Sequence, residues 1–62
     1  MKWRKHDGSA IVSEDGRYAI ARLGAAYEVW RTRKHEEGPH LCATNIGDAQ
    51  EARRLAEADS RE

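Results

Sequence analysis

His40 and Cys42 come closest, by residue type and spacing, to a pair that could carry chemistry. They lie two residues apart on an expected strand, so their side chains would point to the same side, as a thiol nucleophile and its base must. A catalytic pair also needs a third group that orients the base, and a pair of N–H donors for an oxyanion. Because the sequence offers no recognisable set of such groups, we predict no catalytic residues and no enzyme activity.

Histidine and cysteine also bind zinc, and His35 lies near the same pair, with His6 as the remaining histidine. Structural zinc sites use four nitrogen or sulfur ligands, with pairs at short fixed spacings. The spacing from His35 to His40 and Cys42 matches no compact ligand pair, and the chain has one thiol. The five glycines are isolated and are typical of turns rather than of phosphate-binding loops. We therefore predict no metal site and no cofactor.

The length and composition favour one thin domain. The 62 residues are 39% hydrophobic and 35% charged, which suffices for a core between two layers but not for a deep pocket. One cysteine cannot form an intrachain disulfide, whereas secreted domains of this size usually have several. No apolar run follows the charged start of the chain, and no stretch approaches the length of a membrane span. We expect a soluble, cytoplasmic protein that does not bind a membrane.

The net charge is zero, but the charges are unevenly distributed along the chain. Residues 1–34 carry eight basic and four acidic groups, whereas residues 35–62 carry three basic and seven acidic groups. The two halves therefore carry +4 and −4. This distribution predicts a dipolar molecule if the fold keeps the halves on different sides.

Turn signals divide the first part of the chain into strands. Asp7-Gly8 and Asp15-Gly16 can adopt the positive φ angles of a two-residue hairpin turn, and Gly24-Ala25 separates two further alternating segments. Gly38-Pro39 cannot continue a central strand, so a short last strand is expected after it. We predict strands at about residues 2–6, 9–14, 17–23, 26–33 and 40–44.

A helix is predicted over about residues 48–59. Asp48 can cap its N-terminus, and Glu51 three residues later completes the pattern of a capping box. The segment consists almost entirely of good helix formers, and one of its faces carries Ala49, Ala52, Leu55 and Ala56. The expected fold of residues 1–62 is a single α+β domain, an antiparallel meander of three to five strands with this helix packed on one face.

The turn positions also predict the register of the sheet. Two-residue turns at the second and third turn signals would pair Ile20 with both Ile11 and Val29, and Ala19 with Trp30. One face of the sheet then carries an apolar set, which consists of Ile11, Tyr18, Ile20, Tyr27 and Val29. We assign the helix to this face, which leaves Trp30 on the open face above small neighbours. In the alternative, the helix covers the other face and Trp30 is a core residue.

Trp30 and the polar residues around it form the predicted contact surface. An exposed tryptophan with nearby arginine is the usual composition of an interface hot spot. We predict that a protein partner binds through Trp30, Arg17, Thr32, Arg31 and Arg33. The runner-up is a small nucleic-acid-binding protein that uses the same basic strands, with Trp30 and Trp3 as a stacking platform. A homodimer that stacks two open faces is the third alternative.

The order of several residues resembles small phage and prophage proteins. The shared pattern is Trp3, a hairpin from Ser13 to Ile20, an aromatic strand with Tyr27, and a helix that opens with the run from Asp48 to Arg53. The resemblance covers most of the chain and implies a bacterial or phage cytoplasmic origin. Some proteins of this kind and size are anti-CRISPR proteins, which inhibit host defence by binding an effector complex. The resemblance therefore implies an inhibitor of such a complex, and it assigns no site residues.

Overall fold

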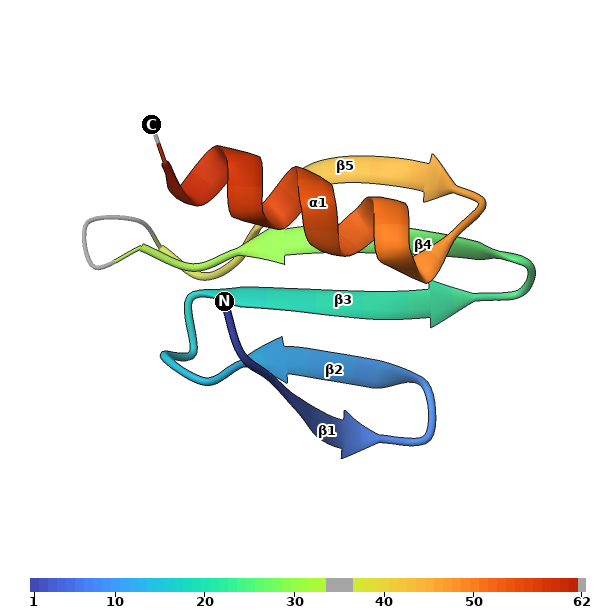
Figure 1. Cartoon of the computed structure of the whole chain (residues 1–62), viewed down its shortest axis with the longest axis horizontal. Coiled ribbons are helices and arrows are strands. Elements are labelled where there is room, and N and C mark those ends of the chain that lie inside the picture. The colour runs from blue at the N-terminus through green and yellow to red at the C-terminus, as the bar shows by residue number, and fades with distance from the viewer. Residues whose placement is uncertain (34–36, 62) are drawn as a thin grey trace.

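A computed structural model describes residues 1–33 and 37–61 and contains five strands followed by one helix (Figure 1). The elements are β1 (Trp3–Asp7), β2 (Ala10–Ser13), β3 (Tyr18–Leu23), β4 (Ala26–Arg31), β5 (His40–Ile46) and α1 (Ala49–Ser60). The predicted α+β class, an antiparallel meander with a C-terminal helix packed on it, is confirmed. Each element begins and ends within two residues of its expected bounds.

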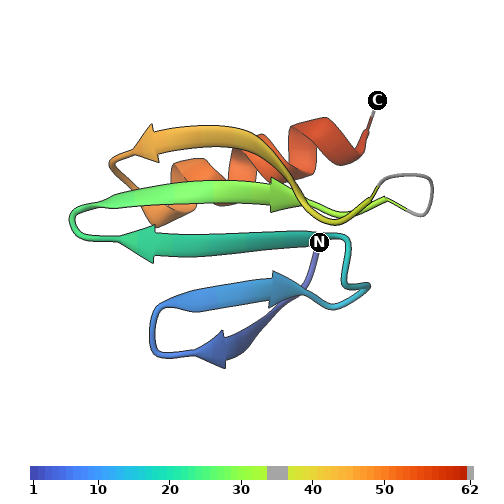
Figure 2. The ribbon, with the colours of Figure 1, turned by 180° about the vertical axis from the view of Figure 1, so that it is seen from behind.

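All five strands form one sheet in the order β1-β2-β3-β4-β5, so each strand pairs with its neighbours in the sequence (Figure 2). Every pairing is antiparallel. Ile20 lies opposite both Ile11 and Val29, and Ala19 lies opposite Trp30, as the turn positions predict. Side chains alternate between the two faces of a strand, so this register decides which residues the helix covers.

The turn at Gly24-Ala25 is the two-residue connection that the sequence predicts, because Leu23 and Ala26 are paired on either side of it. Gly24 has a φ of +63°, a left-handed conformation that glycine adopts without steric cost. This turn sets the pairing of β3 with β4, the two central strands below the helix.

The connection at Asp15-Gly16 is longer than a two-residue turn, because β2 ends at Ser13 and β3 begins at Tyr18. Asp15 Oδ1 accepts hydrogen bonds from the Ser13 hydroxyl at 2.7 Å and from the Arg17 N–H at 3.0 Å. The Ser13 hydroxyl oxygen in turn accepts a hydrogen bond from the Tyr18 N–H at 3.0 Å. These side-chain bonds hold the wider loop while the predicted register of the two strands is kept.

The first turn lies one residue later than predicted. Asp7 pairs with Ala10, so Gly8-Ser9 forms the connection rather than Asp7-Gly8. Asp7 Oδ1 accepts hydrogen bonds from the Ser9 N–H at 2.7 Å and from the Ser9 hydroxyl at 3.1 Å. An aspartate that bonds the backbone two residues further on favours a turn that starts at its own position, which accounts for the shift.

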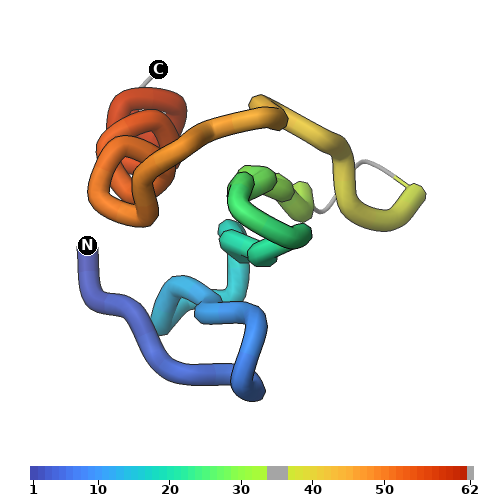
Figure 3. The backbone as a smooth tube through the Cα atoms, turned by 90° about the vertical axis from the view of Figure 1, so that its right-hand side faces the viewer, coloured from blue at the N-terminus to red at the C-terminus, as the bar shows by residue number. Residues whose placement is uncertain are grey.

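The helix lies across β3, β4 and β5 on one side of the sheet (Figures 1 and 3). Ala52 and Ala56 are fully buried there, and their small side chains allow the helix to approach the strands closely. The rest of the buried core comes from the sheet and consists of Tyr18, Ile20, Val29 and Ile46. The assignment of the helix to the face that carries Ile20 and Val29 is therefore confirmed.

The buried stripe of the helix differs in one residue from the expected one. Leu55 was expected on the buried face, but it is 39% exposed. Ala52, Ala56 and the half-buried Asp59 follow one another at spacings of four and three residues, which places them on one line along the helix. Leu55 therefore lies beside the contact with the sheet rather than within it.

The helix begins where the sequence predicts. Asp48 has an extended backbone, and its carboxylate accepts a hydrogen bond from the Gln50 N–H at 3.0 Å, which confirms it as the N-cap. A carboxylate oxygen of Glu51 lies 3.6 Å from Arg54 Nη1, one helical turn away.

No helix in residues 1–33 and 37–61 is long and apolar enough to cross a membrane.

Candidate functional site

The face of the sheet opposite the helix carries one row of side chains that crosses all five strands. In the register this row consists of Arg4, Val12, Ala19, Trp30 and Leu41. Within the described ranges, α1 is the one element that packs on a face of the sheet, and it packs on the other side (Figure 3). We call this row and its neighbours the open face.

Trp30 occupies the middle of the apolar part of the open face. Val12, Ala19 and Trp30 are each half-buried by their neighbours on the adjacent strands, and Leu41 on the edge strand is 46% exposed. Glu28, on the same face, accepts a hydrogen bond from the Thr44 hydroxyl at 3.2 Å. The open face therefore combines a continuous apolar strip with flanking polar groups of both charge signs.

Arg17 and Thr32 lie close together at the end of this strip. The Thr32 N–H donates a hydrogen bond to the Arg17 carbonyl oxygen at 2.7 Å, and both residues are exposed. Thr32 follows Trp30 by two residues, and Arg17 precedes Ala19, the partner of Trp30, by two residues. The structure thus brings together three of the five residues expected at the contact surface.

Arg31 and Arg33 extend toward the helix instead. Arg31 Nη1 lies 3.5 Å from Asp59 Oδ1, and Arg33 Nη2 lies 4.0 Å from Asp59 Oδ2. Arg31 is also the strand partner of Tyr18, whose side chain belongs to the core. The five expected contact residues are therefore divided between the two faces of the sheet.

Asp59 also accepts a hydrogen bond from the Tyr18 hydroxyl, at 2.6 Å. Burial and this bond to a carboxylate raise the pKa of Tyr18 to about 12. The same bond, followed by the charge of Arg31, lowers the pKa of Asp59 below its usual value. Sequence reasoning missed this contact because 41 residues separate its partners. The signal in the sequence was the position of Asp59 one turn after Ala56 and two turns after Ala52, in line with the buried side of the helix.

His40 and Cys42, which were considered for nucleophilic or metal chemistry, lie on the edge strand β5, whereas His6 lies on β1 at the opposite edge of the sheet. Cys42 is exposed and is not part of a disulfide, and its thiol donates a hydrogen bond to the His40 carbonyl oxygen at 3.8 Å. His35 lies outside the described residues. Among residues 1–33 and 37–61, no group of three or more histidine, cysteine, aspartate or glutamate side chains is placed to hold a metal ion.

Trp3 lies on the helix side of the sheet rather than on the open face. It pairs with the buried Ser13, is half-buried, and packs against the core. Trp3 and Trp30 therefore cannot form the joint stacking platform that was considered for nucleic acid.

Comparison of the chain with protein families, with curated proteins and with solved structures found no match.

Proposed function

We propose that this protein is a non-catalytic protein-binding module whose contact surface is the open face centred on Trp30. The observation that carries the proposal is the uncovered strip of Val12, Ala19, Trp30 and Leu41 across four adjacent strands. A large aromatic side chain among smaller apolar neighbours, with polar groups at the rim, is the usual arrangement of an interface hot spot. Arg17 and Thr32 supply that rim at one end.

The charge arrangement favours a protein partner over nucleic acid. Phosphate binding requires several cationic groups that are available together. Arg31 and Arg33, which would have contributed to a basic strand surface, lie beside Asp59 on the helix side. The open face also carries the carboxylate of Glu28, which would repel a phosphate backbone.

The partner class rests on the resemblance to small phage proteins. We propose that the protein acts in the bacterial cytoplasm as an inhibitor of a host defence complex of the CRISPR-Cas type. In this function, inhibition needs only occlusion of a surface on the effector complex, which a rigid face of five strands can provide without any catalytic group.

The first test is the capture of partners by an affinity-tagged form of the full chain. Lysates of bacteria that carry CRISPR-Cas systems would be divided into nuclease-treated and untreated halves. The recovered proteins would be identified by mass spectrometry. Each candidate complex would then be purified and tested for direct binding to the protein. We expect a defined effector complex whose recovery survives nuclease treatment and changes little with salt. Recovery that disappears with nuclease, or falls steeply as salt rises, would indicate nucleic-acid binding instead.

Replacement of Trp30 tests the site. We expect Trp30→Ala to weaken binding to the purified partner at least about 30-fold, because truncation of a hot-spot residue costs about 2 kcal/mol or more. Leu55→Ala, which removes a partly exposed apolar side chain on the helix, is the matched control and should bind normally. Affinity would be measured by calorimetry, with thermal unfolding as the check on folding.

A second variant covers the case in which Trp30→Ala does not fold. Leu41→Glu places a charge on the same strip at a position that is already 46% exposed, so the fold should tolerate it. Unchanged binding of a folded Trp30→Ala protein, or of Leu41→Glu, would contradict the proposed surface. Sedimentation of the protein alone as a dimer that Leu41→Glu separates would instead identify a second copy as the occupant.

A further inference from the structure

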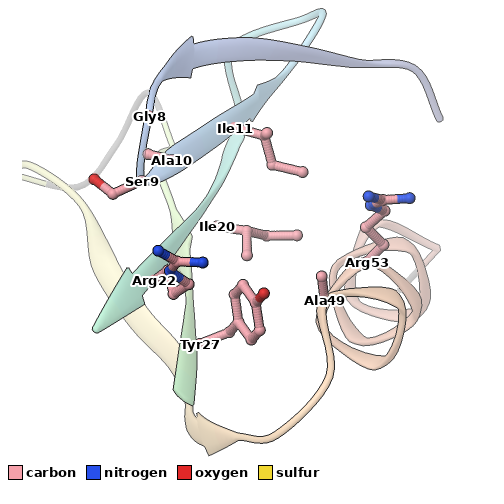
Figure 4. A pocket seen from close by; sticks show the side chains of 9 residues that line it. All are labelled: Gly8, Ser9, Ala10, Ile11, Ile20, Arg22, Tyr27, Ala49 and Arg53. Atoms are coloured by element: carbon pink, nitrogen blue, oxygen red, sulfur yellow. The ribbon is translucent and has the colours of Figure 1, made fainter. Parts of the chain in front are cut away.

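The helix side of the sheet contains a hollow of about 190 Å³ beside the helix. The helix packs on β3, β4 and β5, whereas β1 and β2 lie to one side of it (Figure 3). The hollow is lined by residues of both β2 and α1. Ile11, Ile20 and Tyr27 point into this space and form an apolar floor, and Ala49 forms part of the wall (Figure 4). The hollow is thus on the opposite side of the sheet from Trp30.

Two arginines flank the apolar floor. Arg22 comes from β3 and Arg53 from the helix, and both line the hollow (Figure 4). Both side chains are exposed, and neither has a hydrogen-bond or ion-pair partner among residues 1–33 and 37–61. By contrast, the adjacent Arg54 pairs with Glu51. The hollow therefore combines apolar contact area with two uncompensated positive charges.

A third cationic residue lies near the same floor. Lys5 of β1 is the strand partner of Ile11 and is exposed. Because paired residues share a face of the sheet, Lys5 belongs to the helix side. Positive groups from β1, β3 and α1 thus surround the apolar residues, although the whole chain has no net charge.

We propose that this hollow is a second binding site, which takes an acidic peptide segment of a partner protein. One apolar side chain of the segment enters the hollow, and carboxylates on the neighbouring residues bind Arg22 and Arg53. The volume is comparable to the cavity of about 150 Å³ that accepts one benzene molecule, which suits a single leucine or phenylalanine side chain. Arginine binds carboxylates through paired N–H groups, which adds directional specificity.

The floor favours a peptide over nucleic acid. Single-stranded nucleic acid is held by aromatic surfaces on which successive bases stack. Here two of the three floor side chains are isoleucines, and Tyr27 is the one aromatic ring. Aliphatic groups suit the side chain of a protein segment and offer no second stacking surface.

The test is a titration of the isotope-labelled full chain, followed by amide chemical shifts. The probe is a blocked pentapeptide with one leucine between pairs of glutamates, and the comparison peptide has glutamine in place of each glutamate. We expect saturable shifts centred on Ile11, Ile20 and Tyr27 with the acidic peptide, in the millimolar range of affinity, and at least about threefold weaker binding of the neutral one. Acetate alone should not reproduce the shifts of the floor residues.

Charge-removing variants locate the binding. Arg22→Gln and Arg53→Gln should each weaken binding of the acidic peptide about threefold to tenfold. Arg54→Gln removes the same charge from the same helix outside the hollow and should leave the affinity unchanged. Neither Arg22 nor Arg53 lies on the open face, so the result is independent of the proposed function of that face.

Several results would overturn the proposal. Equal binding of the acidic and neutral peptides, or equal weakening by Arg53→Gln and Arg54→Gln, would show that the hollow does not recognise carboxylates at this place. The absence of floor shifts at peptide concentrations of about 10 mM, roughly ten times a dissociation constant of about 1 mM, would exclude the site. Tighter binding of a short single-stranded oligonucleotide at the same residues would show that the ligand of the hollow is nucleic acid and not a peptide.

Discussion

Asp59 joins the end of the helix to polar groups of the sheet. Its carboxylate accepts the Tyr18 hydroxyl at 2.6 Å and lies within 4.0 Å of the guanidinium groups of Arg31 and Arg33. Hydrogen bonds to a charged group contribute about 1.5–3 kcal/mol, roughly twice as much as neutral ones. Arg31 therefore has a structural role beside Asp59, and the more exposed Arg33 adds a longer and weaker ion pair.

The contact between Tyr18 and Asp59 predicts a loss of stability at alkaline pH. The pKa of Tyr18 is about 12 in the folded protein and near its ordinary value of 10.0 in the unfolded chain. The folded state thus favours the protonated phenol, so its contribution is fully present below pH 10 and is lost as pH rises toward 12. We expect the free energy of unfolding to fall by up to about 2 kcal/mol over this interval.

Tyr18→Phe should remove that dependence and cost about 1–3 kcal/mol at neutral pH, because the Asp59 carboxylate loses a hydrogen bond. Urea unfolding curves at a series of pH values would measure both effects. Tyr27→Phe keeps Tyr18 and should therefore keep the alkaline loss. If the free energy of unfolding falls equally at alkaline pH in Tyr18→Phe, the fall is caused by the titration of another group.

At the scale of the elements, the close fit of the helix against the sheet depends on two alanines. Ala52 and Ala56 have no exposed surface, and they face the buried side chains of Tyr18, Ile20 and Val29. A larger side chain at either position would have to push the helix away from the strands. The distance between the two layers is therefore set by the smallest side chains of the interface.

We expect Ala56→Leu to lower the free energy of unfolding by about 1–3 kcal/mol, the usual cost of overpacking a filled interior. Ala58→Leu makes the same change at an exposed position of the same helix and should alter stability by no more than about 0.5 kcal/mol. Thermal and urea unfolding of both variants would give the comparison. Equal effects of the two substitutions would contradict the close packing at Ala56.

The elements with strong local signals were predictable from the sequence, as the Asp48 cap and the pairing of Leu23 with Ala26 illustrate. Once that pairing was set, alternation placed Ile20 and Val29 on the covered face. The shifted first turn was not predictable, because it depends on the hydrogen bonds that the Asp7 carboxylate accepts from Ser9. β5 also runs beyond residue 44 to the buried Ile46, after Asn45 adopts a φ of +61°.

The candidate site was less accessible to sequence reasoning than the fold. Alternation correctly placed Trp30 on the open face, but proximity in sequence grouped it with Arg31 and Arg33, which extend to the other side. The hollow between β2 and α1 was not foreseen, because Arg22 and Arg53 are 31 positions apart and meet only in the folded chain. Contacts of this kind depend on how the two layers are placed, which local patterns do not encode.

For the whole molecule, one helix must stabilise the entire sheet. The buried side chains of β3, β4 and β5 lie beneath α1, while the open face lacks a second layer within the described ranges. A chain of this length buries only about 60% of the surface that its unfolded form exposes. Stability therefore depends on a single interface between two layers.

A chain that ends before the helix, at residue 47, should consequently fail to fold. We expect residues 1–47 to show no cooperative thermal transition, because Tyr18, Ile20 and Val29 would lose their cover. Circular dichroism and sedimentation would distinguish an unfolded or aggregated chain from a folded one. A cooperative transition in residues 1–47 would show that the sheet is stable without its helix.

The sequential order of the strands has a consequence for how the protein is made. Each strand pairs with the one synthesised just before it, so hairpins can form early and at low entropic cost while the ribosome is still translating. The helix, however, comes last and must close contacts such as that between Tyr18 and Asp59, 41 residues apart. Until residues 49–60 are made, the apolar side chains of Tyr18, Ile20 and Val29 lack the helix that buries them, and the incomplete chain is prone to aggregation during this interval.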